Sequence, residues 1–171
     1  MNTESAAGSI RSWRREMKPW QVRIQLVVIA CLVAAIVSLF IDSSIPDWYE
    51  SLHKPSFTPP IAFFAVVWLV LYGCMAAAAW LIGQMPRTRA ANRALMLFAI
   101  QLMLSILWTM DFFHYHVVGP ALFLIVLLWI ALLLTTIRFW HLRRSTIYLL
   151  APCLAWVTFT ALLNLEIALF N

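Results

Sequence analysis

The sequence has few charges and none of the motifs that identify common soluble enzymes. Only 11% of its 171 residues are charged and 64% are hydrophobic, whereas a soluble domain has about 25% charged and about 45–50% apolar residues. A chain of this size cannot hide so much apolar surface in its own core, so we expect a lipid environment. No Ser/His/Asp constellation, phosphate-binding loop or pair of catalytic carboxylates is recognisable.

The cysteines and the basic residues argue against a disulfide or cysteine active site and against a nucleic-acid partner. Cys31, Cys74 and Cys153 all lie inside apolar runs, where a cysteine is usually a small buried hydrophobe rather than part of a disulfide or an active site. The net charge of +5 comes from basic residues near the ends of apolar segments. That placement indicates membrane topology and no nucleic-acid partner.

One short polar stretch contains candidate metal ligands. Asp111, His114 and His116 lie within six residues of one another, but two histidines and one carboxylate fall short of a specific ligand set. We therefore predict an ordinary polar loop and no metal site. Ligation of a haem iron by His53 or His114 is a weaker alternative.

The apolar residues fall into five segments, each close to the ~20 residues that cross a bilayer as a helix. Their approximate limits are 21–41, 60–82, 94–112, 118–138 and 147–169. No alternating strand pattern competes with helices. The sequence therefore predicts an all-α integral membrane protein, with a polar basic tail at residues 1–20 and a five-transmembrane-helix bundle at residues 21–171. Nothing in the tail resembles a signal-peptide cleavage site, so we expect the first helix to be uncleaved.

The basic residues alternate between the two ends of the expected helices. They gather in the tail and in the connections 83–93 and 138–146, whereas the connections 42–58 and 111–117 carry acidic residues and histidines. Cytoplasmic loops of membrane proteins carry an excess of lysine and arginine. The pattern predicts a cytoplasmic N-terminus and a C-terminus on the opposite side of the membrane.

Three of the expected helices carry aromatic and hydrogen-bonding residues with helical spacing. These stripes include Phe64, Trp68 and Tyr72 on the second helix, Gln101, Ser105 and Trp108 on the third, and Trp156, Thr160 and Asn164 on the fifth. Amide side chains are unfavourable against lipid, so we expect the stripes to face the bundle interior. Together they would form an aromatic pocket for a large flat ligand. An equally supported alternative is a packed interior in which the polar groups satisfy one another.

The stretch SLHKPSFTPP, residues 51–60, is a stiff polar connection that leads directly into the first of these stripes. Thr58 is a candidate cap for the second helix, and Pro59 and Pro60 suit its start. A lid over a ligand cavity is one interpretation, because loops of this kind often gate sites. A rigid connector is the other.

The stretch WYESLHKPSFTPPIAFFAVVWLVLYGCMAAAAW, beginning at Trp48, resembles the signature of the TspO/MBR family, the tryptophan-rich sensory and translocator proteins. The matching positions are Trp48, Tyr49, Leu52, Lys54, Pro55, Pro59, Pro60, Phe64, Trp68, Leu71, Tyr72 and Met75. LSILWTMDFF and the last apolar segment are also similar to the family, so the likeness covers about residues 45–171. It implies a five-helix membrane bundle that binds porphyrins such as protoporphyrin IX and haem, sterols and benzodiazepine-type drugs under the first loop.

The resemblance and the stripes together define the expected site. The expected ligand-binding residues are Trp48, Pro55, Phe64, Trp68, Tyr72, Gln101, Ser105, Trp108, Trp156, Thr160 and Asn164. Some bacterial members are credited with light- and oxygen-dependent porphyrin breakdown, and the resemblance implies Trp68 and Trp156 as the catalytic candidates for it. The chain departs from the family pattern where Ser105 replaces an asparagine and Cys153 a tyrosine. These changes remove hydrogen-bonding groups and predict a different ligand preference.

Three functions remain open at this point. The first is a membrane binding or sensor protein for porphyrins and related hydrophobic ligands, with porphyrin or haem as ligand and no required cofactor. The second is an enzyme that degrades porphyrin through its tryptophans, and the third is a small tetrapyrrole transporter. The partners that we expect are the lipid bilayer and a second copy of the chain. A homodimer is suggested by the family resemblance and by small residues at four-residue spacing, such as Gly73 and Ala77.

Overall fold

The computed structural model describes residues 58–86 and 88–170, and the regular structure of this part of the chain is entirely helical. Its main helices are α4 (Ile61–Gly83), α5 (Arg89–Thr109), α6 (Val118–Leu142) and α7 (Ile147–Phe170), with a π-helical turn at Met110–His114 and a 3₁₀ turn at Arg144–Thr146. Within these described residues, four helical segments are long and apolar enough to cross a membrane. The prediction of a multi-pass, all-α membrane protein is confirmed for these four. The predicted first span, 21–41, lies outside the described residues.

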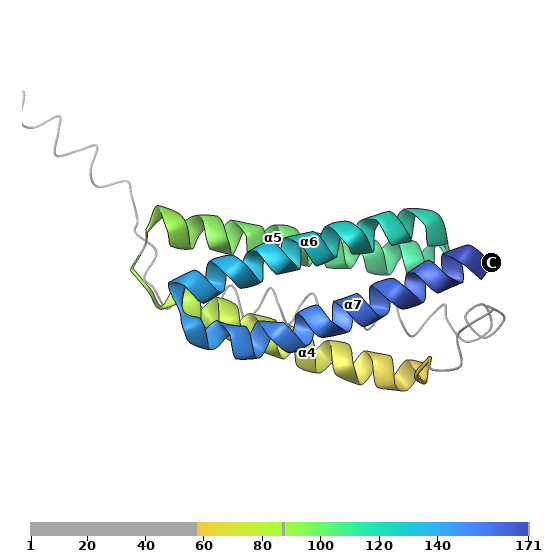
Figure 1. Cartoon of the computed structure of the whole chain (residues 1–171), viewed down its shortest axis with the longest axis horizontal. Coiled ribbons are helices and arrows are strands. Elements are labelled where there is room, and N and C mark those ends of the chain that lie inside the picture. Colours follow the sequence, from red (N-terminus) through yellow and green to blue (C-terminus); the bar gives the residue numbers. More distant parts are fainter. Residues whose placement is uncertain (1–57, 87, 171) are drawn as a thin grey trace, which may run out of the picture.

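Successive helices run antiparallel and pack as neighbours along the chain (Figure 1). α5 packs on α6 and α6 on α7, while α4 contacts both α5 and α7. α4 and α6 therefore begin at the end of the bundle where α5 and α7 finish. This arrangement brings the first turns of α4, the last turns of α5 and the last turns of α7 to one end.

A proline marks the start of α4. Pro60 is its N-cap residue, in the place that we expected Thr58 to take. The expectation that Thr58 caps this helix is therefore wrong. Proline fits this position because it has a fixed φ and lacks an N–H that would need a partner. The carbonyl oxygen of Pro60 accepts from the backbone N–H groups of Phe63 and Phe64, at 2.9 and 3.3 Å.

α5 begins earlier than the apolar segment suggested, at Arg89 rather than near residue 94. Its N-cap is Thr88, whose side-chain oxygen accepts from the backbone N–H of Ala91 at 3.1 Å. Such a cap satisfies one of the free N–H groups of a first helical turn. Arg89 and Arg93 thus lie on the helix rather than in the connection that we expected.

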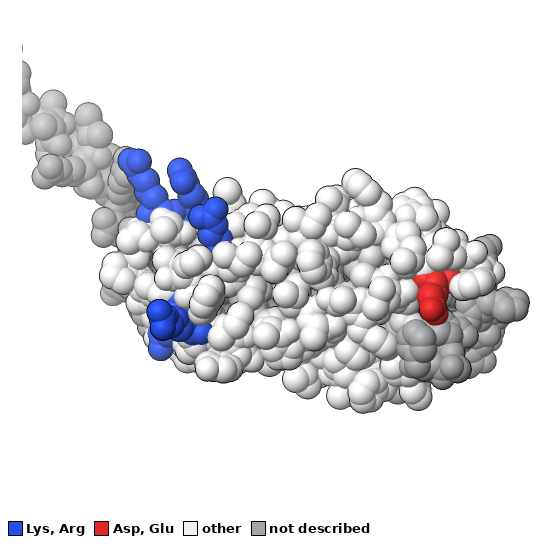
Figure 2. Space-filling view, in the orientation of Figure 1, with Lys and Arg blue, Asp and Glu red and all other residues white. Residues whose placement is uncertain are grey.

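Charge is divided between the two ends of the bundle (Figure 2). We call one end the basic end, because all the described arginines lie there: Arg89, Arg93, Arg138, Arg143 and Arg144. The other is the acidic end, which holds the described carboxylates. Asp111 lies in the π-helical turn after α5, and Glu166 lies near the end of α7. The separation agrees with the alternation of charge in the sequence, and the side of the membrane on which each end lies remains a prediction.

The half of the bundle nearer the basic end has a conventional packed core. Phe98 of α5 and Phe139 of α6 are fully buried, and their ring centroids are 6.0 Å apart. The hydroxyl groups of Thr135 and Thr136 are buried as well, and each donates to the carbonyl oxygen four residues earlier, at 2.7 and 2.8 Å. This half satisfies its buried hydroxyl groups through its own backbone.

Candidate functional site

A chain of aromatic rings links α4, α5 and α7 towards the acidic end. The ring centroids of Trp68 and Trp108 are 5.8 Å apart, and those of Trp108 and Phe112 are 5.7 Å apart with nearly parallel planes. On the other side, Phe64 lies 5.1 Å from Trp156 in an edge-to-face arrangement. Separations of 4.5–7 Å are those at which aromatic pairs attract one another beyond simple area burial. The structure therefore brings the aromatic stripes of three helices together.

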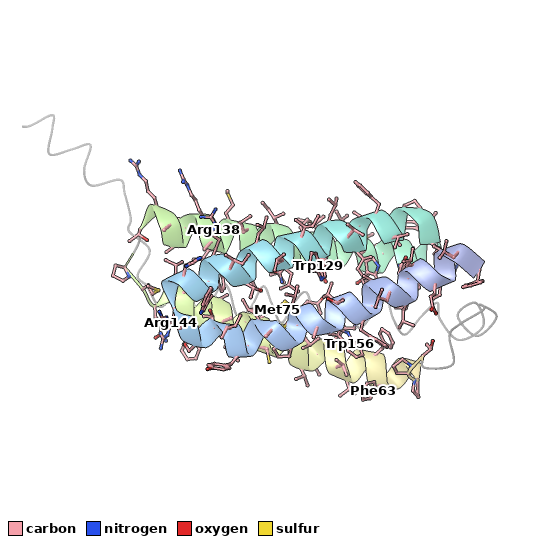
Figure 3. All side chains as sticks on the ribbon, viewed as in Figure 1. Phe63, Met75, Trp129, Arg138, Arg144 and Trp156 are labelled. Atoms are coloured by element: carbon pink, nitrogen blue, oxygen red, sulfur yellow. The ribbon has the colours of Figure 1, made fainter. Side chains whose placement is uncertain are left out.

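Trp156 joins the last helix to the first turns of α4 (Figure 3). Its ring lies 6.1 Å from that of Phe63 and 5.3 Å from that of Phe159. Trp156 is half-buried, whereas Phe63 is exposed on the outer surface. The indole thus stands between the interior of the bundle and its lipid-facing side.

The π-helical turn after α5 brings two consecutive phenylalanines into the interior. The backbone N–H of Tyr115 donates to the carbonyl oxygen of Met110, five residues earlier, at 3.0 Å. Phe112 and Phe113 are both buried and pack edge to face at 4.9 Å. A regular α-helix turns 100° per residue and would direct two neighbouring side chains to different faces. Single π turns are frequent at functional sites.

This turn corrects one expectation from the sequence. Asp111 and His114 were predicted to lie in a polar loop, but they belong to the π-helical turn. The loop itself is short, and it includes His116 with a positive φ of 56°, a conformation uncommon for residues other than glycine. The described residues contain no group of three or more His, Cys, Asp or Glu side chains that could hold a metal ion.

A small cavity opens between these rings at the acidic end. Its internal volume is about 10 Å³, enough for about one water molecule. Its lining residues are Phe64, Trp108, Phe112, Phe113, Thr160, Leu163, Asn164 and Ile167. We call this cavity, together with the adjoining indoles of Trp68 and Trp156, the aromatic pocket.

Several polar groups around the aromatic pocket are buried without a hydrogen-bond partner among the described residues. They are the indole Nε1 atoms of Trp68, Trp108 and Trp156, and both side-chain amide atoms of Asn164. Asn164 is 1% exposed and lines the cavity. A buried donor or acceptor without a partner costs about 1–3 kcal/mol. Such groups are rare in folded proteins, and each calls for an explanation.

Further from the cavity, the predicted polar residues find partners within the protein. The hydroxyl groups of Tyr72 and Ser105 are 2.5 Å apart, in a buried hydrogen bond between α4 and α5. Gln101 donates from Nε2 to the sulfur of Met75 at 2.9 Å, although its Oε1 atom has no partner in the described chain. These contacts match the alternative in which interior polar groups satisfy one another.

The predicted site residues therefore fall into three groups. Phe64, Trp108, Thr160 and Asn164 line the cavity, with Trp68 and Trp156 against its walls. Tyr72, Gln101 and Ser105 form the polar contacts between α4 and α5. Trp48 and Pro55 lie outside the described residues, as does most of the stretch proposed as a lid.

Two aromatic residues of the site were missed by sequence reasoning. Phe112 continues the stripe of Ser105 and Trp108, and helical periodicity assigned the next residue, Phe113, to a different face. Phe159 packs on Phe64 at 6.5 Å and on Trp156, but it lies three residues after Trp156 and had no polar neighbour to distinguish it. The spacing of Trp156 and Phe159 at i and i+3 was the available signal for the second of these.

Comparison with known proteins places the chain in a family. The sequence matches the TspO/MBR family over residues 26–170. It is 35% identical to "Tryptophan-rich protein TspO" of Chlorobaculum tepidum over 150 residues, which are 86% of this chain and 95% of that protein. It is 34% identical to "Protein CrtK" of Rhodobacter capsulatus over 125 residues, 72% of this chain and 78% of that protein. Human "Translocator protein" is 31% identical over 148 residues, 85% of this chain and 88% of that protein. With these matches over most of its length, the chain belongs to the TspO/MBR family.

Proposed function

We propose that this membrane protein binds porphyrins and related flat hydrophobic ligands in the aromatic pocket. The observation that carries the proposal is a set of buried polar groups beside aromatic walls that have no partner in the described part of the chain. They are the indole N–H groups of Trp68, Trp108 and Trp156 and the amide of Asn164. A protein that used these side chains only for packing would gain nothing from leaving them unpaired. A ligand that offers hydrogen-bond acceptors would satisfy them.

The walls of the pocket suit a planar aromatic ligand. Trp108 and Phe112 present ring planes that differ by only 21°, and Trp68 continues this arrangement with a tilt of 32°. Aromatic rings attract one another best when offset-stacked or edge to face. A macrocycle could therefore stack on the α5 side of the pocket while the edges of Phe64 and Trp156 meet it from the opposite side.

The size of the cavity implies that binding moves these walls. Its internal volume of about 10 Å³ is far below the roughly 300–1,000 Å³ of typical ligand pockets. The π-helical turn that carries Phe112 and Phe113 is the wall least constrained by regular α-helical bonding. We expect ligand entry to shift this turn, and the environment of Trp108 with it.

A titration of the purified protein with protoporphyrin IX tests the proposal. Binding should quench tryptophan fluorescence and change the porphyrin absorption spectrum. Trp108→Leu should weaken binding by about tenfold, because it removes a stacking surface and a donor. Trp140→Leu is the matched control, since Trp140 is exposed near the basic end and lies far from the cavity. Equal affinities of the two variants would contradict the proposal.

The same experiment, repeated under illumination in air, separates binding from the enzymatic alternative. Unchanged porphyrin after illumination supports a binding or sensor role. A new product that disappears in Trp68→Phe and Trp156→Phe supports tryptophan-dependent degradation, with these residues as the catalytic groups. Flux of porphyrin into proteoliposomes tests the transporter, which the name of the human relative suggests for that protein.

We also propose a cytoplasmic N-terminus and a homodimeric assembly. The orientation is supported by the gathering of arginines at one end of the helices. The dimer is supported by Gly73, where an added Cβ atom would meet nothing within 4 Å, so another helix could approach α4 closely. Reporter fusions at Asn171 and cross-linking in native membranes test the two proposals separately.

A further inference from the structure

We propose that the turn between α6 and α7 is a binding site for the headgroup of an anionic phospholipid. The site lies at the basic end, away from the aromatic pocket, and it does not depend on porphyrin binding. It rests on the charge of the turn, on the backbone bonds that hold the turn in place and on the side chains that flank it.

The turn carries two adjacent cations that no described carboxylate neutralises. Arg143 and Arg144 follow the end of α6, and both are exposed. Figure 2 shows the basic side chains of this end in two groups, one over the first turns of α5 and the other at this turn, where Figure 3 labels Arg144. The described carboxylates, Asp111 and Glu166, both lie at the acidic end. The positive charge of the turn is therefore open to a partner from outside the described part of the chain.

The backbone of the turn is held from the inside. The N–H group of Arg143 donates to the carbonyl oxygen of Phe139 at 2.7 Å. The carbonyl oxygen of Arg143 accepts from the backbone N–H of Thr146 at 3.1 Å and from the Thr146 hydroxyl group at 2.8 Å. Thr146 is fully buried, whereas Ser145 before it is exposed. The arginine side chains thus start from an ordered backbone, so less entropy is lost when a ligand binds.

Amphipathic aromatic side chains flank the turn on both helices. Trp140, in the last turn of α6, is 45% exposed, and Tyr148, in the first turn of α7, is 82% exposed. Further along α6 the exposed side chains are apolar, beginning with Ile137 and Leu134. Tryptophan and tyrosine are enriched where the hydrocarbon of a bilayer meets the headgroups. The turn therefore lies at the level of the phosphates, and a lipid-facing apolar surface adjoins it.

The donors of the turn match a phosphodiester. A guanidinium group presents a planar fork of N–H donors that binds phosphate oxygens in pairs. The exposed side chains of Ser145 and Tyr148 can supply hydroxyl donors as well. A zwitterionic headgroup offers the same phosphate but adds a cation, which the two arginines repel. Phosphatidylglycerol has no such cation, so the turn should select the anionic lipid.

The test compares phosphatidylglycerol with phosphatidylcholine of the same acyl chains. Each is titrated into the purified protein in a neutral detergent, and bound lipids are counted by native mass spectrometry. The parent should bind its first phosphatidylglycerol about tenfold or more tightly than its first phosphatidylcholine, since a basic residue near an anionic membrane surface contributes about fivefold. In Arg143→Gln/Arg144→Gln this preference should be lost.

Arg89→Gln/Arg93→Gln is the matched control. It removes the same charge from the other basic group, on α5, whose first two turns contain no aromatic residue. Its preference should change by less than about twofold, because the first lipid occupies the turn. Arg143→Lys/Arg144→Lys keeps the charge but removes the forks, so its preference should lie between those of the parent and the glutamine variant. Circular dichroism verifies folding, and the single glutamine variants serve where a double variant does not fold.

Three outcomes would overturn the inference. Equal loss of preference in the two glutamine double variants would mean a general effect of net charge and no site at the turn. Equal binding of both lipids by the parent would exclude selection of an anionic headgroup. Excess inorganic phosphate should leave the lipid bound, because the acyl chains supply part of the contact. Its displacement by phosphate would mean a simple anion site in place of a lipid site.

Discussion

Buried hydroxyl groups have backbone partners in both halves of the bundle, as Thr160 shows near the acidic end. The halves differ in their buried indole and amide groups. Near the basic end, the hydroxyl groups of Thr135 and Thr136 donate to backbone carbonyls within their own helix. Near the acidic end, the indole of Trp108 and the amide of Asn164 are buried without partners among the described residues. Both halves lie in the same membrane bundle and are built from the same helices. This difference is what the proposed ligand contacts of the indole and amide groups would explain.

Matched aromatic deletions in the two halves should give the largest contrast. Phe98 and Phe112 are both buried, one in each half of the segment formed by α5 and its π turn. Replacing either by alanine should lower stability by about 3 kcal/mol, the low end of the range for such cavities, because the unfolded reference is partly lipid-solvated. Only Phe112→Ala should also weaken porphyrin binding, by about tenfold or more, through the lost stacking surface.

Thermal unfolding in detergent, followed by circular dichroism, and porphyrin titration at low temperature provide the two measurements. Phe98→Leu and Phe112→Leu serve where the alanine variants do not fold. If Phe98→Ala reduced affinity as much as Phe112→Ala, the division between a structural half and a binding half would be wrong.

A second contrast concerns Asn164, whose amide we propose contacts the ligand. Asn164→Leu has a similar volume and removes two buried atoms that have no partner in the described chain. We expect the ligand-free protein to become more stable by about 1–3 kcal/mol, and porphyrin affinity to fall. Thr136→Val at the other end should instead lower stability by about 1 kcal/mol, because its hydroxyl group has a partner.

The melting temperatures of both variants, measured without ligand, test whether Asn164→Leu raises stability and Thr136→Val lowers it. A destabilised Asn164→Leu protein would mean that the amide has a structural partner, and the pocket would then lose its main polar contact.

These contrasts also show which parts of the architecture the sequence could predict. The limits of α4, α6 and α7 follow from apolar length, because about 20 residues are needed to cross the hydrocarbon. The start of α5 was misplaced because Arg89 and Arg93 were interpreted as a connection, whereas Thr88 caps a helix that includes them. Charge near a helix end marks the membrane boundary and not the end of the helix itself.

The sequence predicted which helix faces form the site, but not which side chains contact one another there. Helical spacing identified the stripes of Phe64, Trp108 and Asn164, which the structure brings to one cavity. It could not show that Ser105 faces Tyr72, because that contact depends on the rotation of two helices about their axes. Nor could it identify Phe113, since the π turn that brings it inward is a departure from the period on which the stripes were built.

A third prediction concerns the hydrogen bond between Tyr72 and Ser105, which lies between the two halves. In a double-mutant cycle with Tyr72→Phe and Ser105→Ala, we expect a coupling energy of about 0.5–1.5 kcal/mol in stability. Because both hydroxyl groups are satisfied within the protein, porphyrin affinity should change less than in Asn164→Leu. Thermal unfolding of the parent, the two single variants and the double variant gives the coupling energy. Additive single effects would show that the hydroxyl groups find other partners.

The smallest effect is expected on the outer surface, where a tryptophan also has a satisfied N–H group. Trp129 of α6 donates from Nε1 to the hydroxyl oxygen of Thr158 on α7 at 2.8 Å, and that hydroxyl in turn donates to the carbonyl of Leu154. Hydrogen bonds between membrane helices contribute about 0.6 kcal/mol on average, so Trp129→Phe should lower stability by about that amount. Its effect on porphyrin affinity should be negligible, because Trp129 does not line the cavity.

The comparison with Trp108→Phe is informative, since both substitutions remove one indole N–H. Loss of the partnered N–H should reduce stability, whereas loss of the unpartnered one should leave stability unchanged or higher and reduce affinity. The same change in both proteins, measured by thermal melts and porphyrin titration, would mean that a missing partner does not distinguish a binding tryptophan from a structural one.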